Sequence, residues 1–303
     1  MWQPRFACPA CGSALASLTQ NGDDRVGCAR CDCSYGRVDG IWRFLRPARQ
    51  SQLEAFVRQY RAIREQEGRR SVPPAYYRNL PSVPAGDPHE DDWRIRQETF
   101  RHLLGHVLAA GAQPSRVLDL GAGSGWLSHR LATLGHQVAA VDAIDDDADG
   151  LGAVRHYASP IVAVQADFDA LPFVPHQFDL VVFNGSLHYS PDPATTLARA
   201  HRMLDSGGTM VVMDSPMFQV ERDGAAMAAD RVRRFASEFG LTEIIQRGSG
   251  YLTFGGLARI AATLSLASRF VPSRGPLVWR MRRRLARLRL GRQPASFGLW
   301  MAR

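Results

Sequence analysis

Residues 117–127 read VLDLGAGSGWL and decide the fold. Apolar, strand-forming residues run into three glycines at alternate positions, Gly121, Gly123 and Gly125, and a helical apolar pattern begins at Leu127. This order predicts a strand, a tight turn and a helix. Glycine suits such a turn because a ligand can lie against bare backbone and because a positive φ costs glycine little. The free N–H groups of the helix N-terminus favour an anionic or carboxylate-bearing ligand.

The glycine spacing separates this turn from the dinucleotide-binding fingerprint, which places its third glycine three residues after the second. That position is Trp126 in this chain. Two acids complete the pattern, because Asp119 precedes the first glycine by two residues and Asp142 ends a second predicted strand nineteen residues beyond Gly123. A carboxylate at that point can accept hydrogen bonds from both hydroxyls of a ribose.

Together these residues resemble the class I S-adenosylmethionine-dependent methyltransferases. The resemblance implies that the three glycines approach the methionine part of S-adenosyl-L-methionine and that Asp142 holds its ribose. It also makes Asp119 a candidate for the cofactor site. The alternative is a strand, turn and helix without a ligand, in which the acid at 142 stands by chance. Agreement among several independent positions favours the cofactor.

Two later strands supply further candidates. Residues 161–165 form a predicted third strand, which Asp167 and Phe168 follow. In the family, an acid here accepts a hydrogen bond from the adenine amino group and an apolar neighbour covers the ring. A surface turn acid is the alternative. Residues 178–184 form a predicted fourth strand, and its last residue, Asn184, is a further cofactor-site candidate.

The loop after the fourth strand holds the predicted catalytic residues. Open parallel sheets place chemistry at the carboxyl ends of their strands. His188 is the one well-placed imidazole in this loop, and our hypothesis is that it contacts or deprotonates the methyl acceptor together with Tyr189. The alternative is a loop histidine that only caps or packs.

Strand and helix patterns alternate through the core, which is typical of a doubly wound parallel α/β sheet. A fifth strand is predicted at 210–214, after a helix that runs to Leu204 and stops at the paired glycines 207–208. Two short strands near 269–271 and 297–301 would complete a seven-stranded Rossmann-like sheet. A single helix is also predicted from Tyr251 to Leu266.

Four acids follow the second strand: Asp145, Asp146, Asp147 and Asp149. We predict that they lead a helix, because acids in a first turn complement the helix dipole. We do not predict a metal site there.

All five cysteines lie within the first 33 residues. Cys8-x-x-Cys11, sixteen residues and Cys28-x-x-Cys31 have the spacing of a zinc ribbon, in which four thiolates bind a structural Zn²⁺ ion and leave no open position for catalysis. Cys33 could substitute for Cys31 or be a small buried residue. Disulfides are the competing account, and the clustering of all thiols in a chain without an apolar signal segment argues against them.

The segment after the cysteines, residues 35–45, carries the pattern Tyr-x-x-Val-Asp-Gly-Ile. A zinc ribbon followed by such a strand resembles the small activator subunit of tRNA and release-factor methyltransferases, fused here to its enzyme. The resemblance implies a docking or stabilising module. We therefore divide the chain into a zinc ribbon (1–46), a helical connector or lid (47–112) and a class I methyltransferase core (113–303).

The connector carries helical apolar patterns broken by prolines. Helices placed before the first strand often lie over the cofactor cleft in this superfamily, so its aromatic and arginine side chains are substrate-pocket candidates. They are Tyr60, Tyr76, Tyr77, Arg78, Trp93 and Arg96. Ordinary helix packing is the alternative for each of them.

The formal net charge of +8 is concentrated at the end of the chain. Residues 269–303 contain ten arginines and no acid, so residues 1–268 carry a net charge of −2. A predicted helix at 279–290 holds six of these arginines and could contact phosphates or an anionic membrane surface. A crossover helix with a solvated basic face is the interpretation we favour from sequence. The sequence has no transmembrane segment, and we expect a cytoplasmic protein.

The predicted function is methyl transfer from S-adenosyl-L-methionine to a small-molecule or lipid-like acceptor at oxygen, nitrogen or carbon. The resemblance is strongest to the ubiquinone and menaquinone type of small-molecule methyltransferase, over residues 116–215. An rRNA or tRNA base methyltransferase is the alternative enzyme, and a non-catalytic cofactor-binding scaffold is the alternative of another class. No cysteine beyond Cys33 is available for covalent pyrimidine methylation, and residues 184–187 lack the Asn/Asp-Pro-Pro-aromatic loop of base-amine methylation, so nucleic acid is disfavoured. The sequence does not indicate an oligomeric state.

Overall fold

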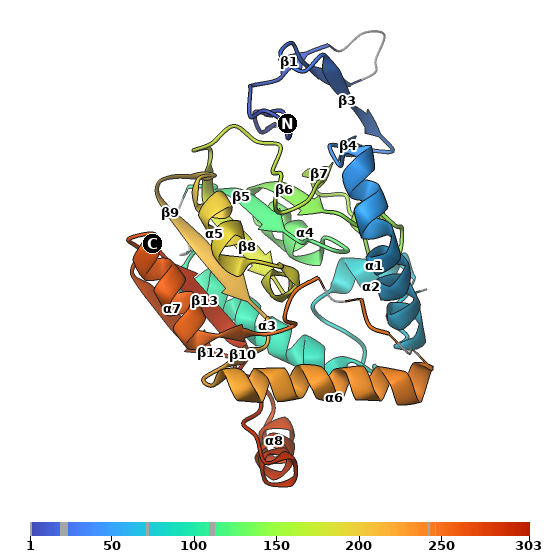
Figure 1. The fold of residues 1–303 in the computed structure, drawn as a ribbon, viewed down its shortest axis with the longest axis vertical. Helices are drawn as coiled ribbons and strands as arrows, with labels where there is room; N and C mark the ends of the chain where they lie inside the picture. The colour runs from blue at the N-terminus through green and yellow to red at the C-terminus, as the bar shows by residue number, and fades with distance from the viewer. Residues whose placement is uncertain (1, 19–23, 71–72, 109–112, 241–242, 246) are drawn as a thin grey trace. The chain divides into compact units, whose positions relative to one another are not determined.

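The computed structural model describes residues 2–18, 24–70, 73–108, 113–240, 243–245 and 247–303 (Figure 1). The chain forms two compact units. Residues 1–78, 114–183 and 195–210 make up the first unit, and residues 79–113, 184–194 and 211–303 make up the second. The predicted boundary at residue 112 lies outside the described residues, and the three-domain division stays a prediction.

The first unit is organised around parallel strands. In sheet order they are β7 (Ile161–Gln165), β6 (Gln137–Asp142), β5 (Arg116–Leu120) and β8 (Phe178–Asn184), followed by the first part of β9 (Leu204–Met213). The pairs from β7 to β8 are parallel. All residues of β7 are buried, as expected for a strand covered on both faces. The third and fourth strands predicted from sequence are confirmed to the residue.

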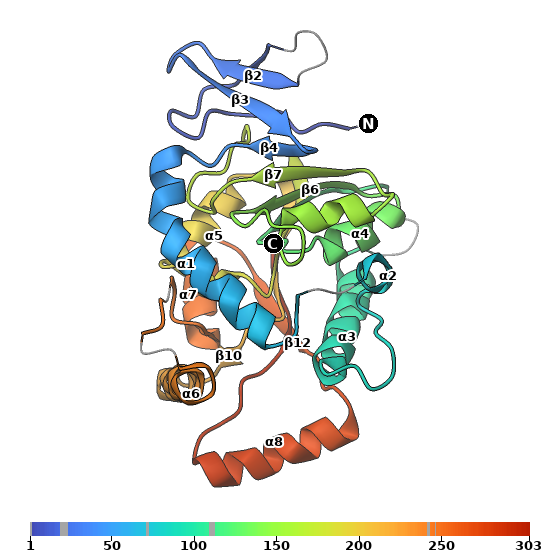
Figure 2. The same ribbon diagram turned by 90° about the vertical axis from the view of Figure 1, so that its right-hand side faces the viewer.

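The cysteine-bearing segment adds four short strands to this sheet. They are β1 (Ala16–Ser17), β2 (Arg25–Cys28), β3 (Cys33–Val38) and β4 (Ile41–Arg43). These strands pair antiparallel in sequence, and β4 then pairs in parallel with β7. The chain turns from β3 into β4 at Asp39 and Gly40, whose φ angles of 52° and 78° suit a tight hairpin turn. Figure 2 shows β2, β3 and β4 continuing the sheet beyond β7.

Five helical segments accompany the first unit. They are α1 (Pro47–Gln66), α2 (Pro74–Asn79), α4 (Trp126–Thr133), the 3₁₀ helix η1 (Leu151–His156) and α5 (Pro193–His201). The prediction that Asp145 to Asp149 lead a helix is wrong, because these residues form loop and turns and only the short η1 follows them. Their carboxylates bind arginines instead of facing a helix N-terminus.

The second unit contains the rest of β9, followed in the sheet by β13 (Gly298–Ala302) and β12 (Ser268–Pro272). Strands β12 and β13 pair antiparallel. The core strands therefore follow the order β7-β6-β5-β8-β9-β13-β12, which confirms the predicted seven-stranded sheet. The four cysteine-segment strands extend this sheet to eleven strands among the described residues. A separate parallel pair is formed by β10 (Met217–Phe218) and β11 (Leu252–Thr253).

Two predicted boundaries are wrong. Strand β9 begins at Leu204 and α5 ends at His201, because the paired glycines taken as a helix end lie within the strand. The helix predicted from Tyr251 begins only at Phe254, after β11. The Thr253 side chain caps that helix by accepting a hydrogen bond from the Gly256 N–H over 3.1 Å.

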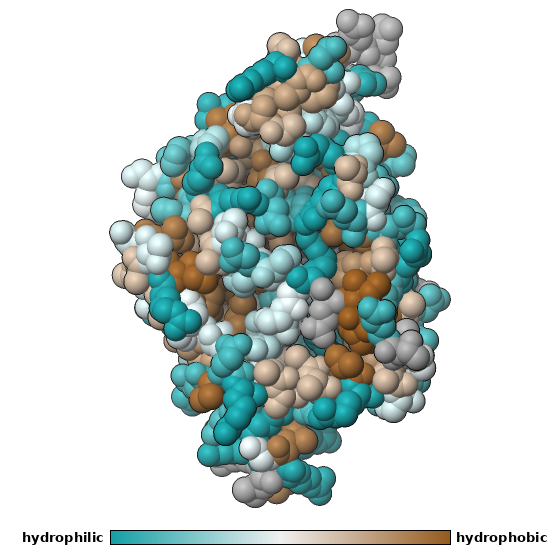
Figure 3. Space-filling model, in the orientation of Figure 1, coloured by the Kyte–Doolittle hydropathy of each residue, from teal (hydrophilic) through white to brown (hydrophobic). Residues whose placement is uncertain are grey.

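The helices of the second unit are α3 (Glu90–His106), the 3₁₀ helix η2 (Leu187–Tyr189), α6 (Glu221–Phe239), α7 (Phe254–Thr263) and α8 (Leu277–Leu290). Hydrophilic and hydrophobic side chains are mixed over α8 on the face that Figure 3 shows. Among the described helices, none combines the length and the hydrophobicity that crossing a bilayer requires.

Candidate functional site

The glycine turn of the first unit joins β5 to α4. Gly121, Gly123 and Gly125 have φ angles of 74°, 54° and 73°, which side-chain-bearing residues rarely adopt. Gly125 is the residue that precedes α4, so the turn ends at the first free N–H groups of that helix. The three predicted cofactor-site glycines therefore share one backbone loop.

Asp142 lies at the end of β6 and is bonded to this loop. Its Oδ2 accepts a 2.8 Å hydrogen bond from the Gly123 N–H, and its Oδ1 accepts one of 2.8 Å from the Ile144 N–H. Burial raises the pKa of this carboxyl to about 6, although the two backbone donors lower it. Each carboxylate oxygen has two acceptor positions, so Asp142 can still accept hydrogen bonds from a ligand.

Asp119 is fully buried in β5. The Ser128 hydroxyl donates a 2.7 Å hydrogen bond to Asp119 Oδ2, whereas Oδ1 has no hydrogen-bond partner in the part of the chain that the structure describes. Burial raises the pKa of this carboxyl to about 7, and the charge of Asp142 also raises it. A buried acceptor atom without a donor is costly, so this oxygen fits a ligand that brings one.

Asp167 and Phe168 follow β7, as the sequence predicts. Asp167 has a partner that the sequence does not predict. Asp167 is 3% exposed, and Arg49 of α1 donates a 2.6 Å hydrogen bond from Nε to Asp167 Oδ2. The Phe168 ring meets the Phe183 ring edge-on at 5.8 Å between centroids. Arg49 is a site residue that the sequence does not reveal, because nothing in its local pattern distinguishes it from the many other arginines of the chain.

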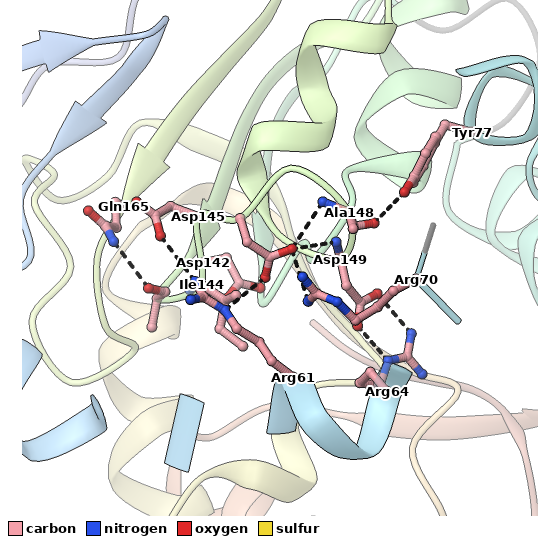
Figure 4. A network of polar contacts seen from close by, with 12 residues as sticks. Arg61, Arg64, Arg70, Tyr77, Asp142, Ile144, Asp145, Ala148, Asp149 and Gln165 are labelled. Atoms are coloured by element: carbon pink, nitrogen blue, oxygen red, sulfur yellow. Dashed lines mark hydrogen bonds and ion pairs between the residues drawn. The ribbon is translucent and has the colours of Figure 1, made fainter. Parts of the chain in front are cut away.

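The loop after Asp142 is held by arginines from the connector, as Figure 4 shows. Arg61 Nε lies 3.2 Å from Asp146 Oδ2, Arg70 Nη1 lies 3.1 Å from Asp146 Oδ1, and Arg64 forms an ion pair with Asp149. Burial raises the pKa of Asp146, but backbone hydrogen bonds and the charges of these arginines outweigh it, so the net shift is downward. These acids therefore anchor α1 and the segment after it to the loop that carries Asp142.

Tyr77 illustrates the packing alternative for the connector side chains. It is 3% exposed, its hydroxyl donates a 2.6 Å hydrogen bond to the Ala148 carbonyl, and its ring stacks on His156 at 4.9 Å. In the second unit, the Arg96 guanidinium lies 4.6 Å from the centroid of the Trp93 ring. These contacts favour the packing alternative for Tyr77, and its assignment to a substrate pocket stays a prediction.

The predicted zinc ligands come together. The sulfur atoms of Cys8, Cys11, Cys28 and Cys31 all lie within 4.8 Å of one another. Tetrahedral coordination with Zn–S bonds of about 2.3 Å places sulfurs roughly 3.8 Å apart, so this group fits a zinc ion. Hydrogen bonding to Cys11 is the largest cause that raises the pKa of the Cys31 thiol, to about 12. Cys33 Sγ lies beside the group, 3.9 Å from Cys8 Sγ. All five cysteines are free of disulfides.

The predicted catalytic residues lie in the second unit. His188 is 7% exposed, and its Nδ1 lies 3.2 Å from the Ser215 hydroxyl. Burial, followed by the charges of Arg231 and Arg96, lowers the pKa of His188 to about 3. Its ring centroid is 4.3 Å from that of Tyr189. Asn184 ends β8, immediately before this loop.

A buried carboxylate that sequence analysis did not single out lies beside this loop. Asp214 follows β9 directly and has a φ of 54°, which is strained for a residue other than glycine. Thr99 Oγ1 lies 2.7 Å from both Asp214 Oδ1 and Ser273 Oγ. Asp214 Oδ2 is buried and has no hydrogen-bond partner among the described residues. The one sequence feature that could have marked Asp214 as a site residue is its position at the carboxyl end of the fifth strand.

Asp214 is adjacent to the predicted catalytic loop through backbone contacts. The Gly185 N–H donates a 2.8 Å hydrogen bond to the Met213 carbonyl, which joins the start of the loop to the end of β9. Ser215, the next residue after Asp214, bonds His188. Burial raises the pKa of Asp214 to about 6, although the charge of Arg96 lowers it.

Comparison with known proteins places this geometry in context. Residues 118–212 match the family model described as a methyltransferase domain. Over 113 residues the chain is 36% identical to an uncharacterised methyltransferase of Mycobacterium tuberculosis, a match that covers 37% of this chain and 55% of that protein. Over 114 residues it is 35% identical to the ubiquinone biosynthesis O-methyltransferase of Xanthomonas campestris, with coverage of 35% and 46%.

A third relative is the malonyl-[acyl-carrier protein] O-methyltransferase of Halorhodospira halophila. The two chains are 33% identical over 151 residues, which is 48% of this chain and 51% of that protein. The chain therefore spans about half the length of the curated relatives that it matches.

Proposed function

We propose that this chain, whose residues 118–212 match the model of a methyltransferase domain, is a class I enzyme that transfers the methyl group of S-adenosyl-L-methionine to a small-molecule or lipid-like acceptor. The observation that carries the proposal is the hydrogen bond from the Gly123 N–H to the Asp142 carboxylate. This bond holds a glycine turn without side chains next to a carboxylate. A dinucleotide fingerprint would need glycine at position 126, where the buried Trp126 begins α4.

Each residue on the cofactor side has a proposed role that its surroundings support. The open Oδ1 of Asp119 would accept a hydrogen bond from the ammonium group of the cofactor, and Asp142 would accept those of the ribose hydroxyls. Asp167 would accept a hydrogen bond from the adenine amino group, and Phe168 would cover the adenine ring. Asn184 is a further proposed cofactor-binding residue. When bound, the cofactor supplies a sulfonium-activated methyl carbon for in-line displacement, so the protein mainly has to align the acceptor and exclude water.

For an acceptor that is methylated on a hydroxyl oxygen, Asp214 is the proposed base. Its unpartnered Oδ2 would take the hydroxyl proton while the oxygen electron pair forms the new bond to the methyl carbon. The bound cofactor would supply the methyl group, and its sulfonium sulfur would keep the electron pair of the carbon–sulfur bond. A pKa of about 6 keeps Asp214 ionised at neutral pH. With a pKa of about 3, His188 is neutral and a weak base, so its proposed role, with Tyr189, is to contact the acceptor.

The proposed acceptor class rests on two relatives, a ubiquinone biosynthesis O-methyltransferase and a malonyl-[acyl-carrier protein] O-methyltransferase. We also propose that Cys8, Cys11, Cys28 and Cys31 hold a Zn²⁺ ion. Four sulfur ligands close the coordination shell, so this ion would stabilise the ribbon and take no part in methyl transfer.

The test uses purified protein, S-adenosyl-L-methionine labelled on its methyl group, and a cell extract that is afterwards divided into organic-soluble, RNA and protein fractions. Label in the organic-soluble fraction is the expected result. Label in RNA would overturn the small-molecule assignment in favour of base methylation. Absence of label from every fraction, together with no saturable cofactor binding by calorimetry, would overturn the enzyme assignment itself.

A further inference from the structure

Helix α8 presents an apolar stripe to solvent. Leu277, Val278, Met281 and Leu285 are between 56% and 66% exposed. At about 100° per residue, these four positions fall within an arc of about 100° on the helix surface. None of the described side chains of α8 is buried. Helix α8 joins β12 to β13 and has a solvated basic face, as expected from the sequence, but its apolar stripe is exposed as well.

The ring and backbone contacts of α8 within the second unit come from the side of the helix opposite the stripe. The Arg283 guanidinium lies 4.1 Å from the centroid of the Trp279 ring and 5.7 Å from that of Phe297. It also donates a hydrogen bond to the Ala295 carbonyl. On the helix surface, Trp279 and Arg283 lie about 100° or more away from every residue of the stripe. The stripe consequently faces away from the unit that carries it.

Arginines border the stripe. Arg282 and Arg289 adjoin one edge of the apolar arc, and Arg280 and Arg287 lie beyond the other. No acid occurs in residues 269–303 to neutralise them. Among the described residues, these four arginines form one ion pair, between Arg282 and Asp91 at 3.5 Å. Both side chains are largely exposed, so the pair contributes little to stability. An exposed apolar arc between arginines is the pattern of a helix that lies in a lipid interface.

We propose that α8 docks the protein on an anionic membrane surface, with the stripe at the acyl boundary and the bordering arginines at the headgroups. An RNA partner would engage the arginines and leave the apolar arc in water. A second copy of the chain would bring two arginine-rich, acid-free segments together, which their repulsion opposes. The proposal does not depend on methyl transfer, so the two can fail separately.

The test is co-sedimentation of the full-length protein with vesicles of phosphatidylcholine alone or of phosphatidylcholine mixed with phosphatidylglycerol. We expect binding to the mixed vesicles and much weaker binding to phosphatidylcholine. The double variant Met281→Gln, Leu285→Gln should bind the mixed vesicles at least about tenfold more weakly, because it removes the centre of the stripe and keeps good helix formers. The double variant Arg282→Gln, Arg289→Gln should lose about tenfold as well and should bind with a weaker dependence on salt.

Two matched controls isolate the helix. Leu134→Gln with Val220→Gln removes two apolar side chains that are 56% and 50% exposed elsewhere, and Arg233→Gln with Arg234→Gln makes the same charge change on α6. Both control proteins should bind vesicles as the unmodified chain does. Absence of binding to mixed vesicles would overturn the proposal, as would unchanged binding of the stripe variant. So would association with an RNA oligonucleotide or with a second copy of the chain in place of vesicles.

Discussion

The backbone N–H of Gly123 lies 2.8 Å from Oδ2 of Asp142, which ties the turn after β5 to the end of β6. The N–H groups of Gly121 and Ala122 reinforce this tie by donating to the Val141 carbonyl over 2.8 and 3.0 Å. The turn is therefore bonded to the neighbouring strand at three points, and one of these bonds needs a carboxylate. These hydrogen bonds form without a ligand, so the glycine loop of the proposed cofactor site is largely preformed.

Replacing Arg49 with glutamine should destabilise the protein by about 1–3 kcal/mol, because the buried carboxylate of Asp167 loses its charged donor. If the adenine amino group binds Asp167, saturating S-adenosyl-L-methionine should restore part of this loss. Thermal unfolding with and without the cofactor measures both effects. Arg58→Gln, which breaks an exposed pair with Glu54, is the control and should change stability by less than about 0.5 kcal/mol. An equal deficit with and without cofactor would count against a cofactor contact for Asp167.

Asp214→Asn should alter how stability depends on pH. The folded protein holds the Asp214 proton up to about pH 6, whereas the ordinary value is 3.8, so the folded state binds more protons between these values. The stabilisation from this residue is fully present below pH 3.8 and is lost as pH rises through about 6. Relative to the unmodified chain, Asp214→Asn should therefore gain up to about 3 kcal/mol between these limits. Asparagine tolerates the positive φ, so the backbone is kept.

Urea unfolding across this pH range measures the difference between Asp214→Asn and the unmodified protein. The subtraction removes the contributions of Asp119 and Asp142, whose pKa values are also raised by burial. Asp91→Asn, an exposed acid on α3, is the matched control and should show no such trend. A stability difference that stays constant from about pH 4 to pH 7 would show that Asp214 is not held protonated by the fold.

His188→Gln should leave the acidic limb of the pH–rate profile where it is, because an imidazole with a pKa near 3 carries no proton over the working range. Glutamine can still bond the Ser215 hydroxyl, so the effect should appear mainly as a raised KM for the acceptor. The profile is measured with labelled cofactor and the acceptor-containing organic fraction. A shift or loss of the acidic limb in His188→Gln, with Asp214→Asn unaffected, would return the base role to the histidine.

Cys31→Ser should lose most of the bound zinc, whereas Cys33→Ser should keep it. The sulfur atoms of the four proposed ligands all lie within 4.8 Å of one another, whereas Cys33 Sγ lies 3.9 Å from Cys8 Sγ but is not a member of this mutually close group. Metal content by atomic absorption and thermal unfolding after chelation give the readout. Because β4 pairs with β7, chelation should also reduce protection of the β7 amides from hydrogen exchange. Equal zinc loss in both serine variants would place Cys33 among the ligands.

The sequence predicts those parts of the fold whose signals are local. Strands at 161–165 and 178–184 are apolar runs bounded by polar residues, and both are found at the predicted positions. The helix predicted at the acids 145–149 is wrong because acidic residues are favoured both in the first turn of a helix and opposite arginine side chains. The helix end predicted at the glycines 207–208 is wrong because glycine occurs both at helix ends and within strands, and here both glycines lie in β9.

The missed site residues depend on contacts between distant positions. Arg49 and Asp167 are 118 residues apart, and Thr99 and Asp214 are 115 apart. No periodicity or motif links such pairs in a single sequence, so only the fold brings them together. The glycine turn and Asp142 could be predicted because their spacing is fixed by one strand, one helix and the next strand.

Calorimetric titration of S-adenosyl-L-methionine into the unmodified protein and into Asp142→Asn tests the central claim most directly. The unmodified protein should show saturable binding. Asp142→Asn should bind about 10- to 100-fold more weakly, since an amide cannot accept both the backbone hydrogen bonds and those of a ribose. Asp147→Asn, an exposed acid of the same loop, should bind as the unmodified protein does. Equal affinity in all three proteins, or no saturable binding in any, would contradict the account.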